Sequence, residues 1–264
     1  MIRKSILLSI MICLILPGLY AQDDMDIAIL GDSNTWLGGD NCDDPKGWTA
    51  WFNERMSPLS CRSYARSGAT WTNTPRTKLN MDENIGKLGD NNVIYNQVCR
   101  LVRACADGEQ AVPHVILIAA GTNDVWFAKE RPHAFEKTIN QVFTRKSKEF
   151  RESPANTMLT LAESVRHCCE LLMYHLPEAQ IVLLTPLQTT KASYTRIAKA
   201  GDIIEECGQR MGINVIRQDH GCCVYDLMEA EEARNTYDGT HTSMEGAKRN
   251  GYFIANQLKA VLQF

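Results

Sequence analysis

The sequence lacks a second long hydrophobic run, and it lacks an excess of charge of either sign. Apart from residues 6–16, no apolar stretch approaches the roughly 20 residues that a membrane-spanning helix needs. The 264 residues contain 28 Lys and Arg against 31 Asp and Glu, for a formal net charge of −3. A chain with this balance offers no reason to expect a phosphate-rich partner. We therefore expect no nucleic acid partner and no stable membrane insertion of the mature chain.

Several diagnostic motifs are also missing. No two cysteines have the C-x-x-C spacing that is typical of zinc sites, so a metal site is poorly supported. The G-x-S-x-G motif of α/β-hydrolases and the phosphate-binding G-x-x-x-x-G-K-[ST] motif are both absent. The sequence thus gives no indication of a bound metal ion or cofactor.

The amino terminus has the features of a secretory signal peptide. Two basic residues precede the apolar run, and Pro17 and small Ala21 follow it. The run of about eleven residues is too short to cross roughly 30 Å of hydrocarbon. We expect cleavage after Ala21, which makes residues 1–21 a signal peptide and residues 22–264 one domain, exported to the periplasm or the cell exterior. An uncleaved membrane anchor is the alternative.

An odd number of cysteines remains once the signal peptide is removed. Loss of Cys13 from the ten cysteines leaves nine, so at least one thiol stays unpaired or pairs between molecules. Some of these cysteines are expected to be small buried apolar residues. The disulfide that we predict joins Cys42 to Cys61.

Short apolar runs alternate along the chain with helical patterns. Runs rich in Ile, Val and Leu, bounded by Gly or Pro, are typical of strands buried on both faces; they cover residues 26–30, 114–120 and 180–185, with weaker candidates at 60–65 and 213–216. Helices are expected over residues 48–56, 92–106, 159–176, 194–211 and 244–262. This alternation predicts an α/β fold with a parallel sheet between helices.

Three polar loops follow predicted strands, and a fourth precedes the last predicted helix. They are GDSNT at residues 31–35, RSG at 66–68, GTND at 121–124 and DGTH at 238–241. Ligands of a parallel sheet bind beyond the carboxyl ends of its strands. The loops are therefore expected to meet at one edge of the sheet and to carry the chemistry.

The residue types in these loops are those of nucleophilic acyl transfer. A serine hydroxyl such as that of Ser33 needs a base and a group that orients the base, and His241 with Asp238 could supply both. The amides of Ser33 and Gly68 and the side chain of Asn123 could stabilise a developing oxyanion. Taken singly, Ser33 could be a helix cap and Asn123 a turn residue. The set as a whole, in this order, favours catalysis.

In order and context, these four loops resemble the four sequence blocks of the SGNH, or GDSL-type, esterase and lipase superfamily. The resemblance runs from about residue 26 to the end and implies a three-layer α/β/α sandwich on a five-stranded parallel sheet. It implies that Ser33 is the nucleophile and first oxyanion donor, with Gly68 and Asn123 as the other donors. It further implies that His241 is the base, oriented by Asp238, in a serine ester hydrolase that requires no cofactor.

One segment has no counterpart in this resemblance. Residues 125–156 follow the third loop and are rich in charges of both signs. A connection of this length usually carries its own structure or a function. We expect a partly helical insertion at the mouth of the site; a solvated surface excursion is the alternative. Two other acidic residues of the motif loops, Asp32 and Asp124, are expected to be structural.

The substrate is indicated mainly by tryptophans near the motif loops. Trp36, Trp48, Trp71 and Trp126 could stack on sugar rings, or they could pack in the core. Together with export and the charged insertion, they favour a carbohydrate esterase that removes acetyl or other small acyl groups from a glycan, with Trp36 and Trp126 as substrate contacts. The alternatives are a lysophospholipase or general short-chain acyl esterase, and a non-catalytic glycan-binding protein on the same fold.

Overall fold

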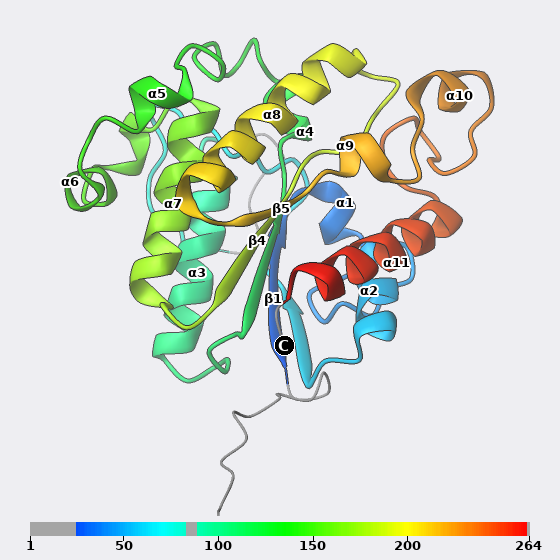
Figure 1. Cartoon of the computed structure of the whole chain (residues 1–264), viewed down its shortest axis with the longest axis horizontal. Coiled ribbons are helices and arrows are strands. Elements are labelled where there is room, and N and C mark those ends of the chain that lie inside the picture. Colours follow the sequence, from blue (N-terminus) through cyan, green and yellow to red (C-terminus); the bar gives the residue numbers. More distant parts are fainter. Residues whose placement is uncertain (1–24, 83–88, 263–264) are drawn as a thin grey trace, which may run out of the picture.

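A parallel β-sheet forms the centre of the fold in the computed structural model, which describes residues 25–82 and 89–262 (Figure 1). The five strands of this described part lie in the order β2-β1-β3-β4-β5. They are β1 (Asp26–Gly31), β2 (Ser60–Ser63), β3 (Val115–Ala119), β4 (Gln180–Leu184) and β5 (Asn214–Ile216). The parallel sheet that the sequence predicts is confirmed. The predicted signal peptide, residues 1–21, lies outside the described residues.

Helices cover both faces of this sheet. The longer ones are α2 (Trp48–Met56), α3 (Ile94–Ala106), α7 (Leu161–His175), α8 (Tyr194–Met211) and α11 (Met244–Val261). The shorter ones are α1 (Ser33–Trp36), α4 (Thr122–Trp126), α5 (Ile139–Val142), α6 (Ser147–Arg151), α9 (Gln218–Gly221) and α10 (Asp226–Glu231). Figure 1 shows α3, α7 and α8 on one side of the sheet and α2 and α11 on the other, which is the expected three-layer sandwich.

The alternation of side chains along the strands creates two cores. Successive strand residues point to opposite faces of a sheet. In β1, Ala28 and Leu30 accordingly face the core beneath α3, α7 and α8, whereas Ile27 and Ile29 face the core beneath α2 and α11. Since both faces are covered, all six residues of β1 are buried. This explains why the strands read as continuous apolar runs rather than as alternating ones.

Side-chain caps begin the helices where the sequence offers them. Thr160 accepts a hydrogen bond from the amide of Glu163 and forms a capping box with it at the start of α7. Ser243 caps α11 by accepting a hydrogen bond from the amide of Gly246. The first cap fixes the residue at which α7 begins, and the second fixes the start of α11 just after the DGTH loop. In the described part of the chain, every helix is too short or too polar to cross a bilayer.

Two of the tryptophans near the motif loops belong to the core. Trp48 and Trp71 are 1% and 0% exposed. The indole nitrogen of Trp48 donates to Oγ1 of Thr35 at 3.2 Å, and that of Trp71 donates to the backbone oxygen of Ala120 at 3.1 Å. These two buried side chains therefore stabilise the motif loops through hydrogen bonds, and they are inaccessible to a sugar ring.

The predicted disulfide between Cys42 and Cys61 is not formed, because both residues are free thiols. The two lie close together all the same: a hydrogen bond with the Cys42 thiol, aided by burial, raises the pKa of Cys61 well above its usual range. The expectation that some cysteines are small core residues is confirmed, since Cys168, Cys169 and Cys207 are fully buried.

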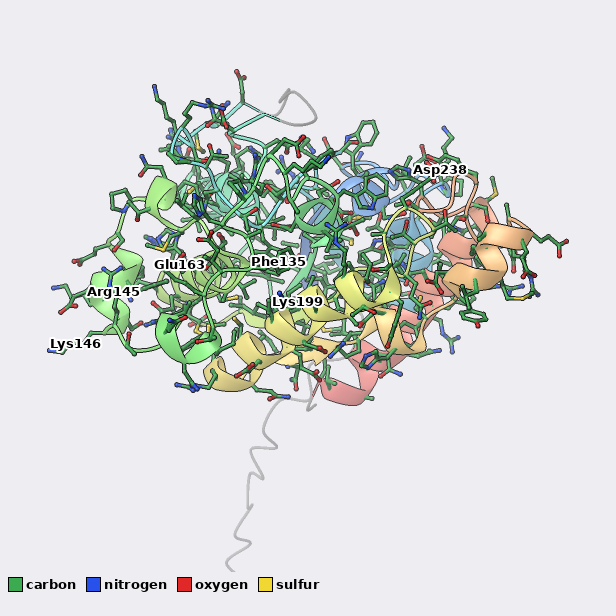
Figure 2. The ribbon with its side chains drawn as sticks, turned by 90° about the horizontal axis from the view of Figure 1, so that it is seen from above. Phe135, Arg145, Lys146, Glu163, Lys199 and Asp238 are labelled. Atoms are coloured by element: carbon green, nitrogen blue, oxygen red, sulfur yellow. The ribbon has the colours of Figure 1, made fainter. Side chains whose placement is uncertain are left out.

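The charged insertion is partly helical, but its helices lie away from the DGTH loop. Helix α5 packs against α7 and α8, and α6 packs against α7. The guanidinium of Arg166 on α7 holds the segment there by donating to the backbone oxygens of Val142 and Arg145, at 2.6 and 2.9 Å. Figure 2 shows Arg145 and Lys146 at one end of the molecule and Asp238 toward the other. The part of the insertion around Arg145 and Lys146 therefore does not cover this loop.

Candidate active site

The first motif loop places Ser33 at the carboxyl edge of the sheet. β1 ends at Gly31, where a side chain would lie 2.6 Å from the backbone oxygen of Ala119, so only glycine fits. The side-chain amide of Gln97 bonds the backbone of Gly31 at both its nitrogen and its oxygen, at 2.8 and 2.9 Å. Asp32 then caps α1, and Ser33 is the first helical residue. The hydroxyl is thereby held on a short, rigid turn.

The last motif loop brings a histidine and an aspartate to this hydroxyl. Nε2 of His241 lies 2.9 Å from Oγ of Ser33, and its Nδ1 lies 2.7 Å from Oδ2 of Asp238. The other carboxylate oxygen of Asp238 accepts the amides of Thr240 and His241. Partial burial acts to raise the pKa of Asp238, but the hydrogen bonds from His241 and Thr240 outweigh it, so the pKa lies below its usual value. Asp238 is therefore ionised and able to orient the imidazole.

A residue without a predicted role, Asn34, joins the two loops. Its side-chain nitrogen donates to the backbone oxygen of Thr240 at 3.2 Å, and its side-chain oxygen accepts the amide of Thr242 at 3.1 Å. These two bonds fix the residues on either side of His241, which lie about two hundred positions from Asn34 in the chain. In the sequence, Asn34 is visible only as the asparagine directly after the serine. Its hydrogen-bond partners are determined by the fold and could not be read from the sequence.

The three predicted oxyanion donors lie on loops that the structure ties together. The amide of Ser33 is at the first position of a helix, where no intrahelical acceptor exists. Gly68 has a φ of 84°, in the region that favours glycine. Asn123 donates from its side-chain nitrogen to the backbone oxygen of Ala69, at 2.9 Å, which places it directly against the Gly68 loop. Its amide group retains a second N–H for another acceptor.

The two acidic neighbours of these residues are structural, as expected. Asp124 accepts hydrogen bonds from the amides of Trp71 and Thr72 and from the Thr72 hydroxyl, so it holds the second loop against the third. Asp32 accepts the amide of Asn34. Burial raises the pKa of Asp32 to about 7, against an ordinary value of 3.8. Asp32 therefore changes its ionisation near neutral pH, directly beside the nucleophile.

Exposed aromatic side chains stand beside the Ser33 and His241 pair. Trp36, three residues after Ser33 on α1, is 44% exposed. Tyr237, for which the sequence suggested no role, is 59% exposed and stacks on the His241 ring with centroids 5.7 Å apart. Trp126 is half-buried, and its indole nitrogen is shut away from solvent with no partner among the described residues. Trp36 and Tyr237 are therefore the more accessible aromatic surfaces.

Together, these groups can perform acyl transfer. The serine has a base in hydrogen-bond reach, the base has an orienting carboxylate, and amide donors lie on the adjoining loops. Within residues 25–82 and 89–262, no group of three or more His, Cys, Asp or Glu side chains is arranged to hold a metal ion.

A comparison with protein families agrees with this geometry. The family model for GDSL-like lipase and acylhydrolase proteins matches residues 27–251. The chain belongs to this family. The resemblance that the four motif loops carry is thereby confirmed, and this GDSL-type protein is a serine ester hydrolase. A comparison with curated proteins gives no match.

Solved structures of similar fold include GDSL-type proteins and a carbohydrate acetylesterase. A candidate GDSL-like lipase from Bacteroides uniformis is 17% identical, with a TM-score of 0.58 over 92% of this hydrolase and 100% of that chain. One from Bacteroides ovatus is 16% identical, with a TM-score of 0.56 over 91% and 100%. A carbohydrate acetylesterase from Sinorhizobium meliloti is 17% identical, with a TM-score of 0.52 over 90% and 100%. At these identities, the similarities establish the fold of the GDSL hydrolase.

Proposed function

We propose that this hydrolase is an exported carbohydrate esterase that removes acetyl or other small acyl groups from a glycan. The observation that carries the proposal is the hydrogen-bonded chain from Ser33 through His241 to Asp238, which lies beside two exposed aromatic rings. The chain of bonds supports ester hydrolysis, and the rings support a sugar as the bound group.

The proposed reaction uses groups that the protein itself supplies. His241 takes the proton of Ser33 as Oγ attacks the ester carbonyl, while Asp238 keeps the other ring proton on Nδ1. The carbonyl oxygen, now negative, accepts hydrogen bonds from the amides of Ser33 and Gly68 and from the side chain of Asn123. The tetrahedral intermediate collapses as His241 gives its proton to the leaving alcohol. Water, activated by His241, then attacks the acyl-enzyme, releases the acid and restores the Ser33 hydroxyl.

The aromatic side chains beside the site support a glycan rather than a lipid. The exposed faces of Trp36 and Tyr237 offer flat apolar surfaces with a polar edge, which suit the C–H faces and hydroxyl groups of a sugar ring. The carbohydrate acetylesterase from Sinorhizobium meliloti has the same fold and adds to this support. A small acyl group then needs no long channel beyond the nucleophile.

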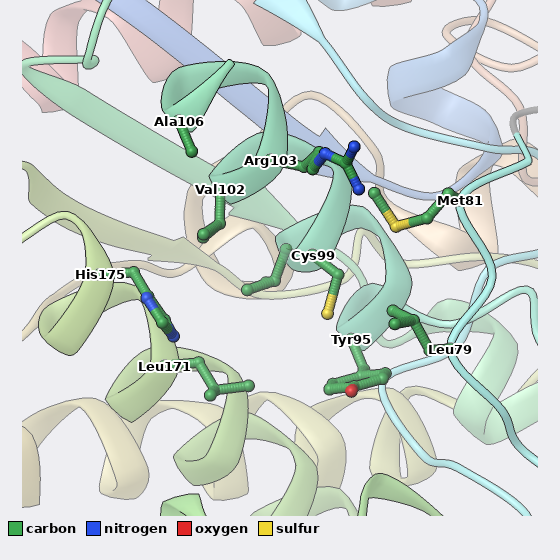
Figure 3. A pocket seen from close by; sticks show the side chains of 10 residues that line it. Leu79, Met81, Tyr95, Cys99, Val102, Arg103, Ala106, Leu171 and His175 are labelled. Atoms are coloured by element: carbon green, nitrogen blue, oxygen red, sulfur yellow. The ribbon is translucent and has the colours of Figure 1, made fainter.

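The position of an apolar hollow also favours a short acyl chain. A hollow of about 510 Å³ lies between α3 and α7, lined by side chains such as Leu79, Tyr95, Cys99 and Leu171 (Figure 3). This is the kind of cavity that could hold a fatty acyl chain. None of its lining residues belongs to the four motif loops. A chain attached to an ester at Ser33 would therefore have to reach another face of the protein to use it.

The proposal is tested with the purified mature protein and its Ser33→Ala variant. A panel of acetylated polysaccharides is incubated with each protein, and released acetate is measured. We expect release by the wild type and none by Ser33→Ala. A parallel series of p-nitrophenyl esters of increasing acyl length should give rates that fall with chain length. A rate that rises with length would favour the lysophospholipase alternative, and failure of a serine-reactive phosphonate to label Ser33 would favour a non-catalytic glycan-binding protein.

A further inference from the structure

A second hollow lies on the same edge of the sheet as the proposed active site. It has a volume of about 570 Å³, within the range of ligand pockets of about 300–1,000 Å³. Its lining includes Gln188, Tyr194, His220, Tyr225, Asp226 and Leu227. We call it the tyrosine hollow. Figure 1 shows α9 and α10, which contribute to its lining, beside the carboxyl end of β5.

The tyrosine hollow is structurally continuous with the loop that carries His241. Gln188 lies on the segment that follows β4, and the next residues of that segment reach the DGTH loop. The hydroxyl of Thr189 and the amide of Thr190 both donate to the backbone oxygen of Gly239, at 2.8 and 2.9 Å. Gly239 stands between Asp238 and His241 in the chain. One rigid segment therefore forms both a wall of the hollow and a support of the DGTH loop.

The hollow is preformed, because its polar floor is already held in place. The side-chain oxygen of Gln188 accepts the amide of Asp226 at 3.1 Å, and its nitrogen donates to the backbone oxygen of Asp219 at 2.7 Å. These two bonds fix the start of α10 relative to α9. A site that needs no rearrangement keeps more of its contact energy as affinity.

The side chains that face solvent around this floor combine aromatic rings with polar groups. Tyr194 and Tyr225 are 44% and 54% exposed, and Leu227 is 61% exposed. Asp226 and His220 add a carboxylate and an imidazole to the same rim. Exposed rings can stack on the C–H faces of a sugar, while the carboxylate and imidazole can bond its hydroxyl groups. Oδ1 of Asp226 accepts the amide of Leu227, and Nε2 of His220 lies 2.9 Å from the Arg217 guanidinium. A purely lipidic ligand would remove water from these polar groups without offering new hydrogen bonds, at a cost in free energy.

We propose that the tyrosine hollow is a distal sugar subsite, which binds a residue of the glycan chain while an acylated sugar occupies the site at Ser33. The inference rests on the proposed glycan substrate and extends it: the substrate is an oligomeric or polymeric glycan, and not a single acylated sugar. The segment that links Gln188 to Gly239 connects the two sites directly.

The test compares substrates that can and cannot reach the hollow. The full mature protein, Tyr225→Ala, and the double variant Tyr194→Ala with Tyr225→Ala are assayed on an acetylated oligosaccharide and on p-nitrophenyl acetate. The ratio of the two kcat/KM values should fall about tenfold in the double variant, mainly through KM for the oligosaccharide. Tyr174→Ala is the matched control, because Tyr174 is an exposed tyrosine on α7, outside the hollow. Its ratio should stay at the wild-type value.

Each other outcome overturns a distinct claim. An unchanged ratio in the double variant, with the wild type active on the oligosaccharide, would refute the subsite and leave the proposed function standing. An equal loss on both substrates would mean that the tyrosines support the fold and do not bind sugar. Activity of the wild type on p-nitrophenyl acetate, without activity on any acetylated oligosaccharide, would refute the glycan function itself and the subsite with it.

Discussion

Replacing Asp238 by asparagine tests whether this carboxylate orients the base. In the structure, Oδ1 of Asp238 accepts two backbone amides, and Oδ2 faces Nδ1 of His241 at 2.7 Å. Asparagine has nearly the same shape and can keep the backbone bonds through its oxygen, but its NH2 group would then face Nδ1. The imidazole must accept that bond, which moves its proton to Nε2, opposite Oγ of Ser33 at 2.9 Å. In this tautomer, His241 cannot accept the serine proton.

The magnitude follows from the exposure of the pair. Loss of the productive tautomer in a buried triad lowers kcat by about 10⁴. The Asp238 side chain is 40% exposed, so water can compete for Nδ1 and restore part of the active form. We therefore expect kcat for p-nitrophenyl acetate to fall about a hundred- to ten-thousandfold, or about 3–5 kcal/mol, with a small change in KM.

A matched control separates this effect from a general loss of charge. Asp107 is similarly exposed, at 44%, and pairs with Arg103 at 2.6 Å on the surface of α3. Asp107→Asn should therefore leave kcat unchanged. Both variants are checked by circular dichroism and by urea unfolding, so that an inactive protein can be told from an unfolded one. A folded Asp238→Asn protein with a kcat within about tenfold of the wild type would refute the orienting role.

Three further predictions test the surroundings of the nucleophile. Asn123→Ala should lower kcat about a hundred- to thousandfold, the usual cost of one oxyanion donor, and an unchanged rate would remove this residue from the site. Tyr237→Leu should lower kcat by a larger factor than it raises KM, because it removes the ring that stacks on His241. Tyr237→Phe keeps the ring and should therefore have the wild-type rate. A low rate in Tyr237→Phe would assign the effect to the hydroxyl group. Because the pKa of Asp32 is raised from 3.8 to about 7 in the folded protein, the stability that it confers on folding is present below about pH 4 and is lost as the pH rises through 7. Compared with Asp32→Asn, the wild type should therefore lose about 4 kcal/mol of unfolding free energy between about pH 4 and 8 in urea titrations, and parallel profiles of the two proteins would contradict this.

The local elements were predictable because their signals are local. The run over residues 27–30 is apolar at every position, as expected for a strand covered on both faces, and the structure places β1 (Asp26–Gly31) there. Ser243 reads as a helix cap from its own position, and it does accept the amide of Gly246. The carboxyl ends of parallel strands share an edge, so the meeting of the three motif loops that follow strands also followed from the pattern.

The contacts between distant segments were not predictable from such patterns. The thiols of Cys42 and Cys61 come close enough for a hydrogen bond, yet no residue spacing says whether two neighbouring cysteines form a covalent bond. The charged insertion was expected at the mouth of the site; Arg166 on α7 instead holds its part around Val142 and Arg145 against α7, through the backbone oxygens of these two residues. The charged composition of the insertion predicts that the segment is exposed, but it does not determine which part of the surface the segment covers.

The sequence by itself determined the α/β order of elements and the chemical groups of the candidate site, since the Ser33, Asn123 and His241 motifs are each contained in a few residues. Only the tertiary structure decided which aromatic rings are accessible: Trp48 and Trp71 became supports inside the core, while Trp36 and Tyr237 stayed at the surface. The physical reason is that a side chain's environment depends on which elements pack over it. That packing follows from the strand order β2-β1-β3-β4-β5, which no local segment encodes.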